Sequence, residues 1–538
     1  MTEVESIRPL AAVLISLVAV AAILASHRYP DIREGWSVAA ALGKFAIVAS
    51  MIPGVLDGRV YVWELETFVP YVTLGLRADP LGMLFALLAS LLWIFTTFYS
   101  IGYMRGLGEH SQTRYFAAFA ASLSAAIGIA FASNLVTIFL FYEMLSIVTY
   151  PLVAHDETEE ARIAGRKYLA YTFLGGGVLV LAGTVIVFWL TSLHADPTVA
   201  FSSGGIEVLM IAAGEDPWPA RVAFFTLVMG FGVKAAIMPV QAWLPDAMVA
   251  PTPVSGLLHV VAVVKSGAFG VARIILDVFG VDLVADLGVG VVIAALAAFT
   301  IVAASLIALR KDNLKRRLAY STVSQLSYIV LGVALLGPYA VLGGLFHMPA
   351  HAFMKLTLFF CAGTIHVETH IDDISKMGGI GKRMPLTMSA FAVAAAGMAG
   401  MPLLAGFVSK FYLVTGGIQA GEAIFAMALI VSGVLNVAYF WPVVYTAFFE
   451  TRTAYDSKPL VEYPPGVGQR AVPDGGHDAQ HAEEWERHTP LTESTWFMLA
   501  PITLVVIGAV ILGIIPGEVI FLELIEMIVD TSVGGGTP

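Results

Sequence analysis

Long apolar segments constrain this sequence more than any other feature. Fourteen of them follow one another along the 538 residues, and a helix of about 20 apolar residues crosses the hydrocarbon core of a bilayer. Only 13% of the residues are charged and 58% are hydrophobic, whereas a soluble domain has about 25% charged residues. We therefore predict an all-α polytopic membrane protein with fourteen transmembrane helices. The predicted spans are residues 9–26, 36–54, 80–101, 115–131, 134–153, 168–193, 221–242, 254–276, 288–309, 317–336, 340–363, 385–415, 422–449 and 496–516.

The seventh and twelfth predicted spans are interrupted in the same way. Pro239 follows Lys234 in the seventh, and Gly400 and Pro402 precede Lys410 in the twelfth. Proline frees backbone groups, which a membrane helix tolerates where the break lines a polar cavity. The two spans are five apart and so run in opposite directions. That pattern is typical of inverted repeats with sites at their broken helices.

The repeats and the charged residues together predict the organisation of the chain. We expect helices 1–3 in residues 1–114, a first five-helix repeat in 115–276, a second, inverted repeat in 288–449, a polar cytoplasmic loop in 450–495, and helix 14 with a tail in 496–538. Nineteen of the 29 Lys and Arg residues fall in loops on one side, five on the other, and five lysines inside spans. Because basic loops stay in the cytoplasm, we expect a multi-pass protein of the cell membrane with both termini outside.

Composition also excludes several classes of function. The single cysteine, Cys361, excludes an internal disulfide framework and an all-cysteine metal site. A net charge of −11 without basic arms argues against nucleic-acid binding. No glycine-rich nucleotide loop follows a strand, so we expect neither a cofactor nor a metal. The first residues, MTEVESIRPL, contain two glutamates, so we interpret the first span as a retained helix rather than a signal peptide.

Three charged residues lie near the middle of predicted spans, where charge is rare and usually functional. Glu143 is in the fifth span, Lys234 in the seventh and Lys265 in the eighth. Burial disfavours a charged lysine, and a carboxylate about 4 Å away favours it by roughly 4 kcal/mol at an effective dielectric near 20. A moving Glu143 would then switch Lys234 between holding and releasing a proton. The alternative is a static ion pair, but lysines outnumber the carboxylate, which favours proton relay.

The eleventh predicted span, GLFHMPAHAFMKLTLFFCAG, contains a row of titratable residues. His347, His351 and Lys355 are spaced i, i+4 and i+8, so they lie along one face of a helix. Histidine titrates near neutrality. The row therefore predicts a proton relay that Lys265 joins and that His259 would extend. The alternative is that the histidines are neutral core residues bonded to neighbouring helices.

Other charged positions have simpler interpretations beside the functional ones. Lys410 is either the exit group of the relay or a snorkelling residue near a helix end. Lys44 either contacts a partner subunit or snorkels. His366 and His370, spaced i, i+4, favour an interface or capping role over a metal site.

The polar segment 451–495 is either a docking surface for a partner subunit or a solvated linker. Metal binding by its histidines is disfavoured. These histidines are His477, His481 and His488.

Five segments of the sequence carry the pattern of a known family. They are FYEMLSIVTYPLV, GVKAAIMPVQAWLPDAMVAPTPVSGLLH, DNLKRRLAYSTVSQLSYI, HAFMKLTLFFCAGTI and PLLAGFVSKFYL. Over residues 75–450 the chain resembles the antiporter-like proton-translocating subunits shared by respiratory complex I and the multisubunit Mrp-type sodium/proton antiporters. The resemblance implies fourteen core helices, inverted five-helix repeats and a proton path. The residues that fall on the path's motif positions are Glu143, Lys234, Lys265, His351, Lys355 and Lys410.

Within this family the sequence favours the D subunit of an Mrp-type antiporter. The chain 4-type subunit of complex I typically has a glutamate where this sequence has Lys410, and the chain 5-type and large Mrp subunits carry long C-terminal extensions. We expect a secondary transporter subunit that relays protons against Na+, with partner membrane subunits and no cofactor. The alternative is a chain 4-like proton-pumping subunit of NADH–quinone oxidoreductase or a related membrane-bound hydrogenase.

Overall fold

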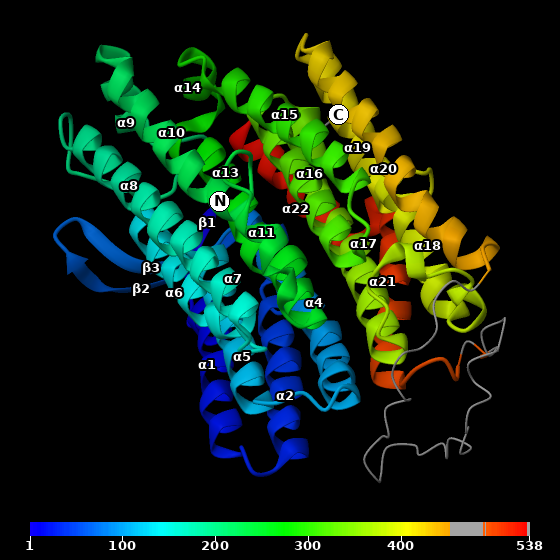
Figure 1. Cartoon of the computed structure of the whole chain (residues 1–538). Helices are drawn as coiled ribbons and strands as arrows, with labels where there is room; N and C mark the ends of the chain where they lie inside the picture. The colour runs from blue at the N-terminus through cyan, green and yellow to red at the C-terminus, as the bar shows by residue number, and fades with distance from the viewer. Residues whose placement is uncertain (452–487, 490, 535–538) are drawn as a thin grey trace, which may run out of the picture.

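The computed structural model describes residues 1–451, 488–489 and 491–534. Long helices lie side by side in one inclined bundle, in which the chain passes from the cyan helices on the left to the yellow helices on the right and its red C-terminal helices return to the middle (Figure 1). Ten helical segments are long and apolar enough to cross a membrane. The polytopic prediction is therefore confirmed, although the number fourteen is not.

The N-terminal part combines membrane helices with a small sheet. Its helices are α1 (Arg8–Ala25), α2 (Pro30–Ala49), the short α3 (Ile52–Leu56) and α4 (Pro80–Gly106). Its strands are β1 (Thr2–Glu5), β2 (Arg59–Val69) and β3 (Val72–Ala78). β1 pairs in parallel with β2, and β2 pairs antiparallel with β3. The fold is mostly helical as predicted, and this small sheet is an addition that was not predicted. β2 is rich in β-branched and aromatic residues, which favour strands, and is too short and polar to be read as a span.

The first half of the bundle contains several interruptions. Its helices are α5 (Gln112–Phe131), α6 (Leu135–Val153), α7 (Glu159–Leu169), α8 (Val178–Thr191), α9 (Glu207–Glu215), α10 (Pro217–Lys234), α11 (Trp243–Asp246), α12 (Thr252–Gly256), α13 (Val263–Arg273) and α14 (Gly280–Asp286). The π-helical turns are η1 (Ala170–Gly177), η3 (Leu257–Val261) and η4 (Ile274–Phe279), and η2 (Ala247–Val249) is a 3₁₀ turn. Single π turns inside helices occur frequently at functional sites.

The second half contains the most buried long helix. Its helices are α15 (Val289–Leu309), α16 (Leu314–Ala334), α17 (Pro338–Thr369), α18 (Pro385–Ala399), α19 (Ala405–Gln419) and α20 (Ala423–Phe449). In α17, 94% of the most apolar 18-residue window is buried. The helix is therefore enclosed by other helices, which explains how it carries titratable residues in a membrane protein.

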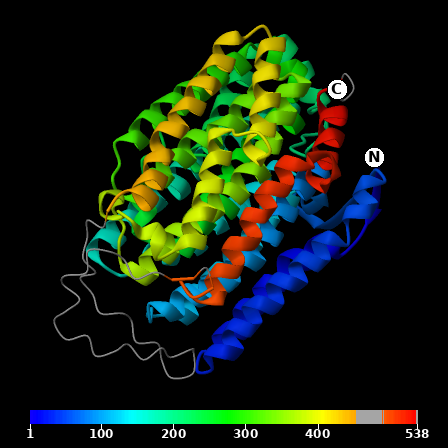
Figure 2. The ribbon, with the colours of Figure 1, turned by 90° about the vertical axis from the view of Figure 1, so that its right-hand side faces the viewer.

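The C-terminal helices return to the N-terminal ones. α21 (Trp496–Ile514) and α22 (Ile520–Ser532) pack against both α4 and α17, as the red ribbon of Figure 2 shows. α22 corrects the prediction of a simple tail after the last span. Its residues IFLELIEMIVDTS place apolar side chains on one face and acidic ones on the other, a pattern of an amphipathic helix.

Both predicted helix breaks are present. α10 ends at Lys234, and Ala236 takes a left-handed conformation (φ 56°) before α11 begins. α18 ends at Ala399, and Gly400 (φ 96°) and Leu403 (φ 70°) precede α19. Four predicted spans fall short of the length and apolarity of a continuous span: those at α10, at α12–η4, at α16 and at α18–α19. These same spans carry breaks, lysines or polar residues, which is why a count of apolar helices stops at ten.

The close approach of α13 to the end of α10 depends on a glycine. A Cβ on Gly267 would lie 2.2 Å from the backbone nitrogen of Ala235, directly after Lys234. We expect Gly267→Ala to destabilise the protein by about 1–3 kcal/mol, because overpacking forces backbone shifts. The measurement is the apparent Tm of the purified protein in detergent. Gly214→Ala in α9, where a Cβ would meet nothing within 4 Å, is the control, and equal melting of the two variants would contradict this packing.

Candidate functional site

Glu143 lies on α6 beside a glycine of the π-helical turn η1. Its side chain is half-buried, and its Oε1 has no hydrogen-bond partner among the described residues. A Cβ on Gly177 would lie 1.9 Å from that Oε1. The glycine therefore provides the space that the carboxylate occupies.

Lys234 is held by the residue next to Glu143. Its fully buried ammonium donates to the backbone carbonyl of Tyr142 and lies 3.3 Å from the centre of the Tyr142 ring. The Tyr142 hydroxyl in turn donates to the carbonyl of Gly230 on α10, at 2.7 Å. Tyr142 thus ties α6 to the last turn of α10.

The predicted ion pair between Glu143 and Lys234 is not closed in this structure. No ion pair joins them in the described part of the chain, because the ammonium is bound to a carbonyl while the carboxylate turns toward Gly177. Each charge still acts electrostatically on the other.

Lys265 and His351 meet between α13 and α17. The ammonium of Lys265 lies 3.0 Å from Nδ1 of His351 and donates to the carbonyl of Met348, also at 3.0 Å. Both side chains are fully buried. The structure therefore brings together two residues of the predicted row that are 86 positions apart.

The row continues from His351 to the second helix break. The rings of His351 and His347 are 5.8 Å apart, and Nδ1 of His347 lies 2.8 Å from the hydroxyl of Ser409. The next residue, Lys410, donates to the carbonyl of Met398 at 2.6 Å. Tyr328 of α16 contacts both sides: its ring stacks on His347 at 5.0 Å and lies 5.4 Å from the Lys410 ammonium.

Lys355 leads away from this row. Its buried ammonium donates to the hydroxyl of Ser321 on α16 and lies 5.4 Å from the centre of the Phe440 ring. His351 and Lys355 share a face of α17 but contact different helices. Lys355 therefore connects α17 to the polar side of α16, not directly to Lys265.

That polar side of α16 is a feature that the sequence analysis missed. Ser321, Ser324, Gln325 and Tyr328 follow the spacing i, i+3, i+4, i+7 and are all buried, so they form one face of the helix. The hydroxyl of Ser324 lies 3.0 Å from that of Ser305. The signal was present in YSTVSQLSYI, where polar residues recur at helical spacing inside a predicted span.

A buried ion cluster around Arg273, near the end of the eighth predicted span, was also missed. Its guanidinium is 1% exposed and binds Asp79 at 2.6 and 2.9 Å and Asp277 at 2.7 Å. Asp79 also caps α4 by accepting from the backbone nitrogen of Gly82 at 2.7 Å. The cluster fastens the start of α4 to the end of α13.

Lys44 fits neither of its predicted roles. It is fully buried within this chain, donates to the carbonyl of Leu123 at 2.9 Å and lies 5.2 Å from the Trp93 ring.

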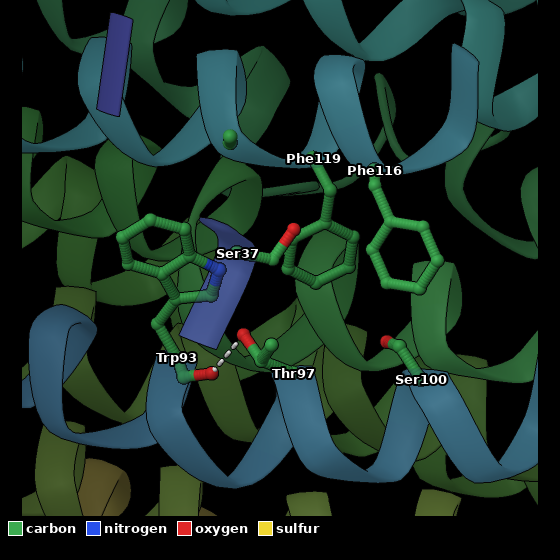
Figure 3. Close-up of a pocket in the computed structure, with 7 residues that line it drawn as sticks. Ser37, Trp93, Thr97, Ser100, Phe116 and Phe119 are labelled. Carbon is green, nitrogen blue, oxygen red and sulfur yellow. Dashed lines mark hydrogen bonds between the residues drawn. The ribbon is translucent and has the colours of Figure 1, made fainter. Parts of the chain in front are cut away.

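Trp93 also borders a cavity of about 10 Å³ between α2, α4 and α5. Figure 3 shows Trp93, Thr97 and Ser100 on one side of it, facing Phe116 and Phe119, with Ser37 between them. A cavity of that size has room for about one water molecule.

The remaining candidate histidines lie elsewhere. His259 is in η3, one turn before Lys265, and its side chain lies outside the described residues. His366 pairs with Asp372 at 2.9 Å, and His370 is the C-cap of α17, which supports a capping role. Most of the polar loop, including His477 and His481, lies outside the described residues.

Comparison with known proteins identifies the same architecture elsewhere. Residues 132–436 match the transmembrane family of NADH:quinone oxidoreductases and Mrp antiporters. NADH-quinone oxidoreductase subunit N of Desulforudis audaxviator is 30% identical over 95% of this chain and 96% of its own length. The A/B subunit of a probable K(+)/H(+) antiporter of Rhizobium meliloti is 29% identical over 94% of this chain, which spans 47% of that protein. A chain of the Mrp complex from Dietzia sp. shares the fold, with a TM-score of 0.77, 21% identity and coverage of 98% and 100%.

The first prediction for this site concerns the position of the Glu143 carboxylate. We expect Gly177→Ala to lower proton flux roughly tenfold, equivalent to about 1.4 kcal/mol, because the new methyl group displaces that carboxylate. The measurement is flux through membrane vesicles, with the amount of assembled protein determined in parallel. Gly175→Ala in the same π turn is the control, since its Cβ would lie 3.4 Å from the nearest atom. Equal flux in both variants would show that the position of Glu143 is unimportant.

The second prediction concerns the contact between Lys355 and α16. Ser321→Ala removes the side-chain acceptor of the Lys355 ammonium, and an unpaired buried polar group costs about 1–3 kcal/mol. We expect reduced proton flux with normal assembly. Ser327→Ala on the same helix is the control, because that hydroxyl bonds only to the carbonyl of Val323 in its own helix. A loss of flux in Ser327→Ala but not in Ser321→Ala would contradict the assignment.

Proposed function

The chain belongs to the transmembrane family of NADH:quinone oxidoreductases and Mrp antiporters, and on that premise we propose that it is a proton-relaying subunit of a multisubunit monovalent cation/proton antiporter. The observation that carries the proposal is the row from Lys265 through His351 and His347 to Ser409 and Lys410. From Lys265 to Ser409, each side chain lies in hydrogen-bond or ring contact with the next. Lys410 follows Ser409 in the sequence, and the Tyr328 ring lies between its ammonium and His347. Groups that exchange protons along a membrane path need such spacing.

In this proposal the row has three parts. Glu143 and Lys234 form the loading group at the first helix break, and Lys265, His351 and His347 form the middle. Lys410 at the second break is the exit group. Lys355 joins the middle through the polar face of α16, and His259 extends the path toward η3.

We further propose that residues 115–276 and 288–449 are inverted five-helix repeats. The two breaks support this division, since a left-handed residue follows each of α10 and α18. The lysine is the last residue of α10 at the first break and lies in α19 at the second. The positive charge of the loops supports an orientation with both termini on the outer side of the cell membrane. In this orientation the loop between α4 and α5 faces the cytoplasm.

The lysine at position 410 favours an Mrp-type antiporter, and among its subunits the D type. The second candidate is a proton-pumping subunit of a redox complex such as NADH–quinone oxidoreductase, in which the chain would be part of an enzyme. The relative named subunit N, which this chain matches along 96% of its length, favours that candidate. Both candidates imply partner membrane subunits, and both use the same proton row.

Transport assays in everted vesicles separate the two candidates. The vesicles come from a host without its own antiporters and contain this chain with its partner subunits. An antiporter moves protons when Na+ or K+ is added to energised vesicles, and separate Na+ and K+ additions identify the cation. Proton movement that requires an electron donor and ignores both cations would support the redox complex instead.

The role of Lys410 gives the decisive variant for this subunit. We expect Lys410→Ala to stop cation-dependent proton flux, because the row then ends without a titratable group. Lys410→Glu should retain measurable flux, since a carboxyl group can also exchange protons. Lys376→Ala, at a lysine whose side chain is 59% exposed, is the control for charge loss. Wild-type flux in Lys410→Ala would make this residue a snorkelling anchor and refute its role.

A further inference from the structure

Three possible metal ligands converge at the end of the bundle where α4 passes into α5. Glu109 and His110 lie in that loop, and His155 follows the end of α6. A carboxylate oxygen and one ring nitrogen from each histidine all lie within 4.8 Å of one another. Oε2 of Glu109 is 3.9 Å from Nδ1 of His110 and 3.9 Å from Nε2 of His155.

His155 is an unusual residue even without reference to a metal. Its side chain is fully buried, yet neither ring nitrogen makes a hydrogen bond of normal geometry in the described part of the chain. Buried polar atoms without partners are rare and call for an explanation. The ring of Tyr115 packs edge-on against the imidazole at 5.6 Å, and Arg114 holds the backbone carbonyl of His155 at 3.1 Å. The imidazole is therefore fixed in place and directed at Glu109.

The ligand set and its spacing suit a transition-metal ion. Two imidazoles and one carboxylate are ligands of Zn²⁺ in sites that keep a fourth position open. Metal–ligand bonds of about 2.0–2.2 Å in tetrahedral geometry place ligand atoms about 3.3–3.6 Å apart. The carboxylate of Glu109 lies 3.9 Å from a nitrogen of each histidine, and the rings of His110 and His155 are stacked with their centroids 4.9 Å apart. Side-chain rotation of Glu109 and of His110, which lies in the loop, would bring the three ligand atoms around one ion. The side chain of His110 is 49% exposed, so an ion can reach the site from solvent.

We propose that Glu109, His110 and His155 bind a Zn²⁺-like divalent ion that fastens the α4–α5 loop to the end of α6. The charge around the site is mixed: Asp156, His366 and Lys315 all act on Glu109. α6 carries Glu143 twelve residues before His155, so a bound ion restrains the helix that positions this carboxylate. Because Glu143 belongs to the proposed proton path, a restrained α6 would slow proton transfer, so the ion would be inhibitory. This inhibitory role rests on the proposed function.

Binding is tested directly, without transport. The full chain is purified with its copurifying subunits, stripped with a chelator and titrated with Co²⁺, whose visible absorption reports tetrahedral coordination. We expect one Co²⁺ that Zn²⁺ displaces and that is lost in both His110→Ala and His155→Ala. His194→Ala, at a histidine near Glu215 (3.6 Å), is the control for the loss of an imidazole. Because the chain has 12 histidines, the readout is the difference between each variant and its parent.

The His110 variant keeps the test decisive if His155→Ala fails to fold, since His110 is exposed. Co²⁺ binding that is unchanged in His110→Ala overturns the site.

Inhibition is tested by adding Zn²⁺ to the vesicle face that bears the α4–α5 loop. We expect at least a tenfold loss of proton flux in the parent and none in His110→Ala. If Zn²⁺ lowers proton flux equally in the parent and in His110→Ala, the restraint of α6 is overturned. If neither protein shows proton flux even without Zn²⁺, the proposed function is overturned, whereas the Co²⁺ binding result still holds.

Discussion

The need to stabilise ammonium groups in an apolar interior shapes the functional half of this protein. Five lysines lie inside the predicted spans, and four of them donate to a backbone carbonyl rather than to a carboxylate. Their acceptors are the carbonyls of Leu123, Tyr142, Met348 and Met398. A buried ion pair that loses one charge leaves the other uncompensated, at a cost of several kcal/mol. A carbonyl dipole leaves no such charge behind, so it suits a lysine that gives up its proton and regains it.

The irregular backbone supplies these acceptors and the space around them. The last carbonyls of a helix have no partner within it, and Met398 lies in the last turn of α18, where its carbonyl receives the Lys410 ammonium. At the other break, Lys234 itself is the last residue of α10. The π turn η1 brings Gly177 to Glu143, and Gly267 lets α13 reach the backbone that follows Lys234. The breaks, the π turns and the glycines are therefore parts of one arrangement.

The sequence predicted the helices and the central row because both depend on local periodicity. Apolar runs of membrane length, proline and glycine breaks, and the spacing of His347, His351 and Lys355 are all visible in a window of one or two turns. Lys265 was assigned to the same relay as His351, but the contact between the two side chains is visible only in the fold. The sheet was not predicted, because its longest strand, RVYVWELETFV, is short and lies among much longer apolar segments.

The features that the sequence did not reveal depend on side-chain direction and tertiary packing. Glu143 was matched with Lys234 by charge and depth, but only the fold shows that its carboxylate turns to Gly177. Arg273 was counted only as one of the basic residues on the outer side, and its partners Asp79 and Asp277 are visible only in the fold. His155 is 45 positions from His110, so no local pattern joins them. Charge pairing in a membrane is thus predicted poorly from depth alone.

The two ends of the row differ from its middle in exposure. Lys265, His351 and His347 are fully buried, whereas Glu143 and Lys410 are only partly covered by this chain. A group with no route to water or to a partner cannot exchange protons with the outside. Under the proposed function, the partial exposure of Glu143 and Lys410 meets this condition at both ends, and the complete burial of the residues between them keeps water away from the middle.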